Sequence, residues 1–140
     1  MKPRINVITI AVADLDRSLA FYRDGLGLPT KGIVGTEFED GAVVFFEMSG
    51  GLILACYPRT ALAKDAGIGV TPGSPSELSI GHAVASREAV DAVMRSAERA
   101  GARITDAARP RFWGGYSGYF QDPDGHLWEI VWNPALQIND

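Results

Sequence analysis

The sequence predicts an α+β fold in which two βαβββ modules place their curled, mixed sheets around a cup, with the helices on the outer faces. The order strand, helix, strand, strand, strand occurs twice along the 140 residues. Each helical pattern follows a capping residue and ends at a glycine, Gly27 in the first half and Gly101 in the second. Because strands twist, the inner faces of two such sheets can enclose a shared cup.

The first module is predicted over residues 4–58. Residues 5–12 are apolar and rich in β-branched side chains, which is typical of a buried strand. Asp14 and Asp16 offer N-cap chemistry for a helix whose apolar residues recur at helical spacing. Strands at 31–39 and 42–48 flank Asp40-Gly41, a strong hairpin signal, and residues 52–57 form the fourth strand.

A connection over residues 59–76 separates the modules, which together form a single domain. The second module, residues 77–134, repeats the order. Residues 78–85 form a strand, Ser86 caps a helix, residues 102–107 form a short strand, and residues 109–111 form a loop. An aromatic strand then meets a turn at residues 122–125 (DPDG), and residues 126–132 form the last strand.

Composition narrows the partners and the compartment. The net charge is −4 and the sequence lacks a basic run, which excludes nucleic acid and anionic membranes as expected partners. No apolar stretch reaches the roughly 20 residues that span a bilayer. The single cysteine excludes an internal disulfide and suits a reducing compartment, so a cytoplasmic location is expected.

The last hairpin contains the first candidate site residues. Glu129 lies between Leu127 and Val131 on one face of a strand, an unfavourable place for a charge unless something binds it. Trp113 and Tyr116 flank Gly114-Gly115 and are predicted to stack on a planar or apolar ligand. The nearby arginines 109 and 111 are interpreted as solvated side chains, with binding of an anionic group as the alternative.

Several motifs make the sequence similar to the vicinal oxygen chelate superfamily. This family includes glyoxalase I, extradiol dioxygenases, fosfomycin-resistance enzymes and bleomycin-resistance binding proteins. The resemblance lies in residues 12–22 (VADLDRSLAFY), 25–27 (GLG), 81–82 (GH) and 122–129 (DPDGHLWE), which together span both modules. It is specific for the fold and poor at separating the chemistries found in the family.

The resemblance implies half of a metal site. Two ligand positions are filled, by His82 and Glu129, whose side chains are expected to converge on one cation such as zinc, nickel, manganese or iron. The corresponding first-module positions are assigned to Val7 and Leu54, with Leu52 or Cys56 if the register is off by two. Two ligands are fewer than stable sites use, so no tightly bound metal is expected, at most a weakly bound divalent ion.

Two functions therefore stand side by side. The first is a binding protein of the bleomycin-resistance type, holding a small apolar or aromatic molecule in a cup. Its wall is assigned to Val7, Leu54, Trp113 and Tyr116, with His82 and Glu129 as polar anchor or as a general acid/base pair. The alternative is a glyoxalase-like lyase or isomerase, or a dioxygenase, using a divalent metal at His82 and Glu129. In both cases a homodimer is expected from the resemblance.

Overall fold

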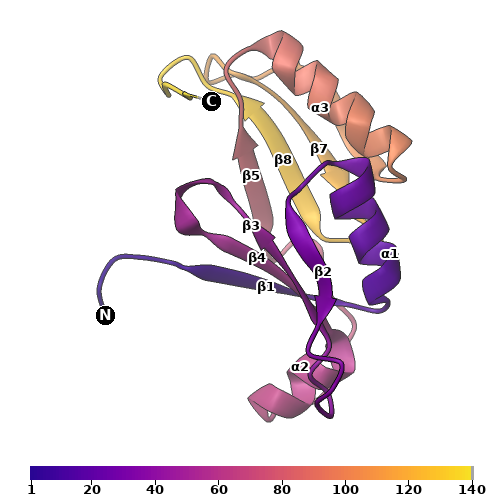
Figure 1. Ribbon diagram of the computed structural model, residues 1–140. Coiled ribbons are helices and arrows are strands. Elements are labelled where there is room, and N and C mark those ends of the chain that lie inside the picture. Colours follow the sequence, from indigo (N-terminus) through magenta and orange to yellow (C-terminus); the bar gives the residue numbers. More distant parts are fainter. Residues whose placement is uncertain (140) are drawn as a thin grey trace. The chain divides into compact units, whose positions relative to one another are not determined.

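The computed structural model describes residues 1–139 of the protein. The chain divides into two compact units, Met1–Pro72 (unit 1) and Gly73–Asp140 (unit 2). Each unit contains one four-stranded mixed sheet with a helix packed on it, and each follows the order β-α-β-β-β. The predicted α+β fold of two βαβββ modules is therefore confirmed, and Figure 1 shows both copies.

Unit 1 has the sheet order β1-β4-β3-β2, in which β1 runs parallel to β4 and the other neighbours are antiparallel. Its elements are β1 (Val7–Val12), α1 (Leu15–Leu19), the π-helical segment η1 (Ala20–Gly25), β2 (Thr30–Val34), β3 (Val43–Glu47), the 3-10 turn η2 (Ser49–Gly51), β4 (Ile53–Pro58) and α2 (Arg59–Ala66).

The helix of unit 1 starts where the sequence predicts. Asp14 is its N-cap, and one carboxylate oxygen accepts hydrogen bonds from the backbone N–H groups of Asp16 and Arg17 at 2.9 and 3.2 Å. The helix widens into π geometry from Ala20, and its inner side buries Phe21 and Tyr22. The ring of Tyr22 lies 5.5 Å from that of Phe46 on β3, so α1 and η1 cover one face of the sheet.

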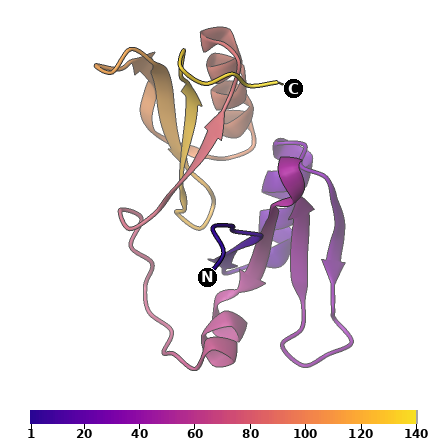
Figure 2. The same cartoon turned by 90° about the vertical axis from the view of Figure 1, so that its left-hand side faces the viewer.

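Unit 2 has the equivalent sheet order β5-β8-β7-β6, with β5 parallel to β8. Its elements are β5 (Ser79–Ala83), α3 (Arg87–Arg99), β6 (Arg103–Pro110), β7 (Tyr116–Gln121) and β8 (Leu127–Trp132). Ser86 caps α3 by accepting a hydrogen bond from the backbone N–H of Ala89 at 3.1 Å, as predicted. In Figures 1 and 2, α3 lies along one face of this sheet, and its contacts are with β6, β7 and β8.

Three departures from the sequence predictions exceed a shift of one or two residues at the end of an element. The strand predicted at 31–39 ends at Val34, and the chain then turns tightly. The turn requires a glycine at position 35, because a side chain there would meet the backbone oxygen of Gly41 at 2.2 Å. The connection begins with α2 and has no helix or strand between α2 and β5 (Figure 2). The loop predicted at Arg109 is part of β6, where Arg109 pairs with Ser117. Among the described residues, no helix has the length and apolar character to cross a membrane.

Candidate functional site

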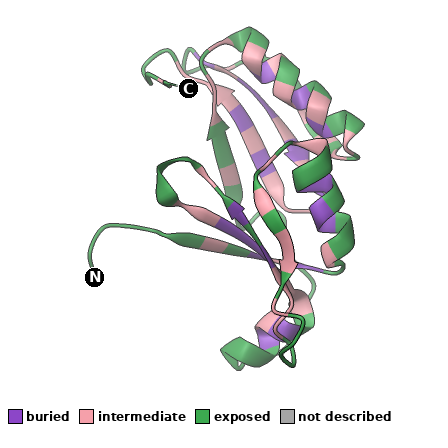
Figure 3. Ribbon diagram, in the orientation of Figure 1, coloured by how far each residue is buried: buried purple, intermediate pink, exposed green. Residues whose placement is uncertain are grey.

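The sheet of unit 2 has one face under α3 and one that α3 leaves uncovered. Trp128 and Ile130 of β8 and Phe120 of β7 are buried on the α3 side. Because strand side chains alternate, their neighbours point the other way. Figure 3 shows buried and half-buried residues alternating along β8. We call this second surface the open face of unit 2; it comprises Ser79, Gly81 and Ala83 of β5, Leu127, Glu129 and Val131 of β8, and Ser117, Tyr119 and Gln121 of β7.

Glu129 lies at the centre of the open face. Its register partners are Gly81 on β5 and Tyr119 on β7, so the three residues form a row across the sheet. Burial raises the pKa of the Tyr119 phenol, and the negative charge of Glu129 together with the hydrogen bond to it raises that pKa further. The phenol therefore stays protonated and can donate a hydrogen bond to the carboxylate.

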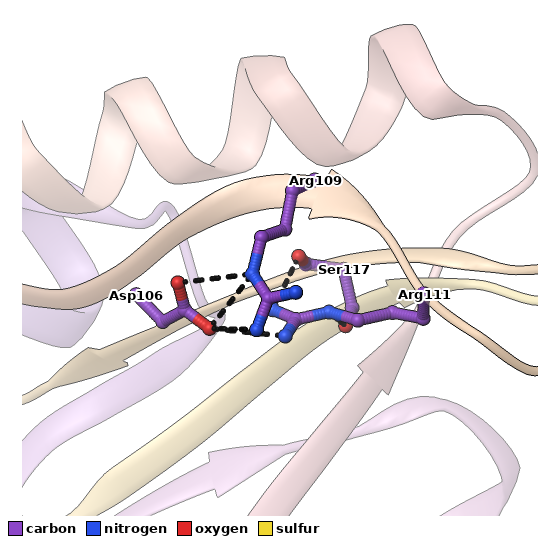
Figure 4. A network of polar contacts seen from close by, with 4 residues as sticks. All are labelled: Asp106, Arg109, Arg111 and Ser117. Carbon is purple, nitrogen blue, oxygen red and sulfur yellow. Dashed lines mark hydrogen bonds and ion pairs between the residues drawn. The ribbon is translucent and has the colours of Figure 1, made fainter.

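Arg111 forms hydrogen bonds to Ser117 and Asp106 at the edge of the open face (Figure 4). Its side chain is only 11% exposed. The guanidinium donates from Nε to the hydroxyl of Ser117 at 2.8 Å, from Nη2 to the carbonyl of Ser117 at 2.8 Å, and from Nη1 to Asp106 at 2.9 Å. It also lies over the ring of Tyr119, 5.4 Å from the centroid. Arg111 thus contacts Tyr119, the register partner of Glu129.

Asp106 pairs with two arginines. It accepts hydrogen bonds from Arg109 at 3.0 Å and from Arg111 at 2.9 Å. These hydrogen bonds hold the pKa of the Asp106 carboxyl below its usual range. Arg111 is therefore a largely buried structural group in an ion-pair network, which corrects its interpretation as a solvated loop side chain.

The structure does not bring His82 and Glu129 together. In the parallel pairing of β5 with β8, Gly81 is the partner of Glu129, whereas His82 is the partner of Ile130. His82 therefore shares the face of Trp128 and Ile130 and is exposed at the edge of the sheet. The expectation that His82 and Glu129 converge on one cation is therefore wrong. His82 is one residue away from the partner of Glu129, and adjacent strand positions point to opposite faces.

Val7 and Leu54 also lie on opposite faces, those of the sheet in unit 1. Val7 pairs with Ile53 and is 48% exposed, whereas Leu54 pairs with Phe46 and Ile8 and is 2% exposed in the core beneath α1 and η1. The assignment of Leu54 to a ligand-lining wall is therefore wrong. The alternatives Leu52 and Cys56 are two residues away from Leu54 and therefore belong to the same face of the strand. Cys56 is fully buried.

The two aromatic candidates for ligand stacking, Tyr116 and Trp113, lie in different surroundings. Tyr116 faces α3, where its hydroxyl donates to Asp91 at 2.7 Å, and this hydrogen bond raises its pKa. Its predicted role in ligand stacking is not compatible with that position on the helix side. Trp113 is 41% exposed, and its ring lies over Gly115, where an added side chain would meet the ring at 1.9 Å.

Sequence reasoning missed Gly81 as the neighbour of Glu129, and it interpreted Arg111 as a solvated side chain with anion binding as the alternative. A signal for the first was available: Val7 precedes its cap Asp14 by the same interval as Ser79 precedes Ser86. Counting from the caps makes Ser79 the counterpart of Val7 and makes Ile10 the counterpart of His82. Ile10 is buried under the helix of unit 1, so its counterpart His82 is expected on the helix-facing side of unit 2. The count from the caps therefore predicts the correct face for His82 and for its neighbour Gly81.

The donor set around Glu129 does not fit a divalent metal. Its neighbours in the row are a glycine and a phenol, and His82 is on the other face. Within residues 1–139, no group of three or more His, Cys, Asp or Glu side chains lies close enough together to hold an ion.

Comparisons with known proteins agree with the fold. Residues 4–130 match the Glyoxalase/Bleomycin resistance protein/Dioxygenase superfamily. A glyoxalase-related enzyme from Fulvimarina pelagi is 33% identical, with 98% of this chain and 93% of that chain covered and a TM-score of 0.83. No curated protein matches the chain.

Two further solved structures share the fold at lower identity. Lactoylglutathione lyase from Agrobacterium tumefaciens is 22% identical, with 99% of this chain and 100% of that chain covered and a TM-score of 0.70. A variant of the fosfomycin resistance protein FosX from Listeria monocytogenes, complexed with Mn(II) and 1S,2S-dihydroxypropylphosphonic acid, is 24% identical. That comparison covers 93% of this chain and 90% of that chain, with a TM-score of 0.67.

Proposed function

The chain belongs to the Glyoxalase/Bleomycin resistance protein/Dioxygenase superfamily, and on this premise we propose that it binds a small molecule on the open face of unit 2. The observation that supports this most is the row Gly81, Glu129 and Tyr119. A half-buried carboxylate with a phenol on one side and a glycine on the other has a hydrogen-bonding partner and adjacent space. Leu127 and Val131 flank the carboxylate along β8 and supply apolar contact for the body of a ligand.

The proposal replaces the His82–Glu129 anchor by a Glu129–Tyr119 anchor. Arg111 contributes by fixing the Tyr119 ring, and Asp106 contributes by fixing Arg111. The groups that touch ligand would be Glu129 and Tyr119, because the donors of Arg111 are directed to Ser117 and Asp106. Without a metal, this pair could bind a ligand or move a proton between carboxylate and phenol.

The test is a binding screen by NMR on the isotope-labelled full chain. A library of small amines, alcohols and carboxylates with aromatic or aliphatic bodies is added, and the backbone amide signals are followed. We expect hits to move the signals of Gly81, Tyr119 and Glu129, and we expect Glu129→Gln to weaken those hits. His82→Ala is the matched control, since His82 is on the other face of the same sheet. Hits that move only signals outside the open face would contradict the proposal.

The metal-dependent lyase or isomerase is the competing function, because FosX, which shares the fold, was solved with Mn(II). Metal analysis of protein purified without chelator separates the two. Near-stoichiometric zinc, nickel, manganese or iron that is lost in Glu129→Ala would favour the metal enzyme over the binding protein. Light scattering on the same preparations measures whether a second copy of the chain is present and able to supply further ligands.

A further inference from the structure

We propose that the anchoring group of the ligand is a protonated amine, seated over Gly81 and donating to Glu129. This inference rests on the proposed function, and it adds the chemical class of the ligand and its position. Three observations carry it: the space at Gly81, the position of Glu129 between Gly81 and Tyr119, and the pairing of the arginines on the same face.

The first observation is an empty position beside the carboxylate. A Cβ atom built on Gly81 meets no other atom within 4 Å. Gly81 is the register partner of Glu129, and neighbouring strands are about 4.8 Å apart, so the space lies one strand away from the carboxylate. The backbone at Gly81 is outside the left-handed region, so the glycine is not required by conformation. Its missing side chain leaves room for a ligand group.

The second observation concerns the carboxylate. An ionised carboxylate only accepts hydrogen bonds, and its two oxygens offer about four acceptor sites. Tyr119 is the register partner of Glu129 on the β7 side, and its one hydroxyl proton can serve at most one of these sites, so acceptor capacity remains toward β5 and the empty position at Gly81. A group that sits there must therefore donate. A charged donor forms the stronger hydrogen bond, which selects an ammonium group over a hydroxyl.

The third observation argues against an anionic ligand. Arg109 and Arg111 both pair with Asp106, and the other donors of Arg111 are directed to Ser117. Arg103 also points to this face, beside Gln121, but it is on β6, two strands away from Glu129. The charged side chain next to the empty position is that of Glu129, the register partner of Gly81. An anion there would be repelled and would lack a donor.

The experiment uses three probes that share a phenyl ring: benzylamine, benzyl alcohol and benzoate. Each is titrated into the isotope-labelled full chain at neutral pH while the amide signals of Gly81 and Glu129 are followed. We expect benzylamine to move both signals and to bind about tenfold or more tightly than benzoate, with benzyl alcohol between them. Benzoate binding as tightly as benzylamine would overturn the amine assignment.

The position is tested with Gly81→Val, which fills the space with a side chain that strands favour. We expect this variant to keep its melting temperature and to lose benzylamine binding, whereas His82→Ala keeps both. Unchanged benzylamine binding in a folded Gly81→Val protein would overturn the placement. If other library molecules bind the open face but no amine does, this inference fails and the proposed function stands. If no molecule of any charge moves the open-face signals, both fail.

Discussion

Unit 1 and unit 2 carry equivalent rows of three residues across the middle of their sheets. The row is Thr9, Ala55 and Phe45 in unit 1, and Gly81, Glu129 and Tyr119 in unit 2. In the first row a threonine replaces the glycine, a small apolar residue replaces the carboxylate, and a phenyl ring replaces the phenol. The same backbone arrangement thus presents a mainly apolar row in one unit and a hydrogen-bonding row in the other.

The helix-facing sides of the two sheets are much more alike. The β3 and β7 strands both place a phenylalanine there, Phe46 and Phe120, and each is fully buried. Phe46 pairs with Leu54, and Phe120 pairs with Trp128. Packing under the helix therefore restricts which residues can occupy one face of each sheet. On the other face, the residue types differ between the two units.

The largest expected effect tests the likeness of the two helix-facing sides. Phe46→Ala and Phe120→Ala should each lower the free energy of unfolding by about 3–5 kcal/mol, because both create a cavity among fully buried side chains. Urea unfolding of both variants and the wild type measures this. A change below about 1 kcal/mol in only one variant would show that the two cores are not equivalent.

A reciprocal exchange tests the difference between the rows. Ala55 is only 2% exposed, so Ala55→Glu would bury a carboxylate beside Phe45 and should cost about 3 kcal/mol or more. Glu129→Ala removes a half-buried charge and should cost no more than about 1 kcal/mol. Thermal and urea unfolding compare the two. Equal effects in both units would remove the distinction that we draw between them.

The next variant tests the hydrogen-bond network of Arg111 at the edge of the open face of unit 2. Arg111→Ala removes the donors to Ser117 and Asp106 and should lower the free energy of unfolding by about 2 kcal/mol. Arg109→Ala is the matched control, since Arg109 pairs with the same carboxylate but is exposed, and its loss should cost less than about 1 kcal/mol. A larger loss in the Arg109 variant would contradict the structural role of Arg111.

Titration of Tyr119 tests its coupling to Glu129. Its pKa in the folded chain is raised above the ordinary value of about 10, so the stability that this provides is present below that pH and is lost as pH rises through the raised pKa. Glu129→Gln should lower the pKa of Tyr119, while burial still keeps it above the ordinary value. Tyrosinate absorbance measures this, with Tyr119→Phe to assign the transition. An unchanged titration would mean that the two groups are not coupled.

The smallest expected effect concerns His82. The side chain is exposed and on the face opposite to Glu129, so His82→Ala should change the free energy of unfolding by less than about 0.5 kcal/mol. Glu129-dependent ligand binding should be unaffected as well. Loss of that binding in the His82 variant, with the fold intact, would restore the pairing of His82 with Glu129 that the sequence suggested.

Local patterns were enough to predict the elements that position the site. The caps Asp14 and Ser86, the turn at residues 122–125 and the alternation along residues 127–132 all depend on neighbours in sequence, and the structure has each of them. The turn is held by Asp122, which accepts hydrogen bonds from the backbone N–H groups of Asp124 and His126 at 2.9 and 2.8 Å. Glu129 was recognised for the same reason, as a carboxylate on an otherwise apolar strand face.

The partners of Glu129 could not be read from the sequence in the same way. Whether Gly81 or His82 stands next to it depends on the register between β5 and β8, strands separated by a helix and two other strands. A shift of one residue exchanges the faces, and the residues of the two strands do not show which register forms; only the comparison of the two cap intervals indicates the parity. The same parity error placed Leu54, a core residue, on a ligand-lining wall.

The sequence by itself determined that this protein is two βαβββ modules with a lone carboxylate in the last strand, because caps, turns and alternation act over a few residues. The tertiary structure alone decided that Glu129 lies between Gly81 and Tyr119, and that Arg111 and Asp106 support that tyrosine. Strand register and the reach of a long side chain join residues far apart in the chain. These contacts form only when the sheet assembles under its helix.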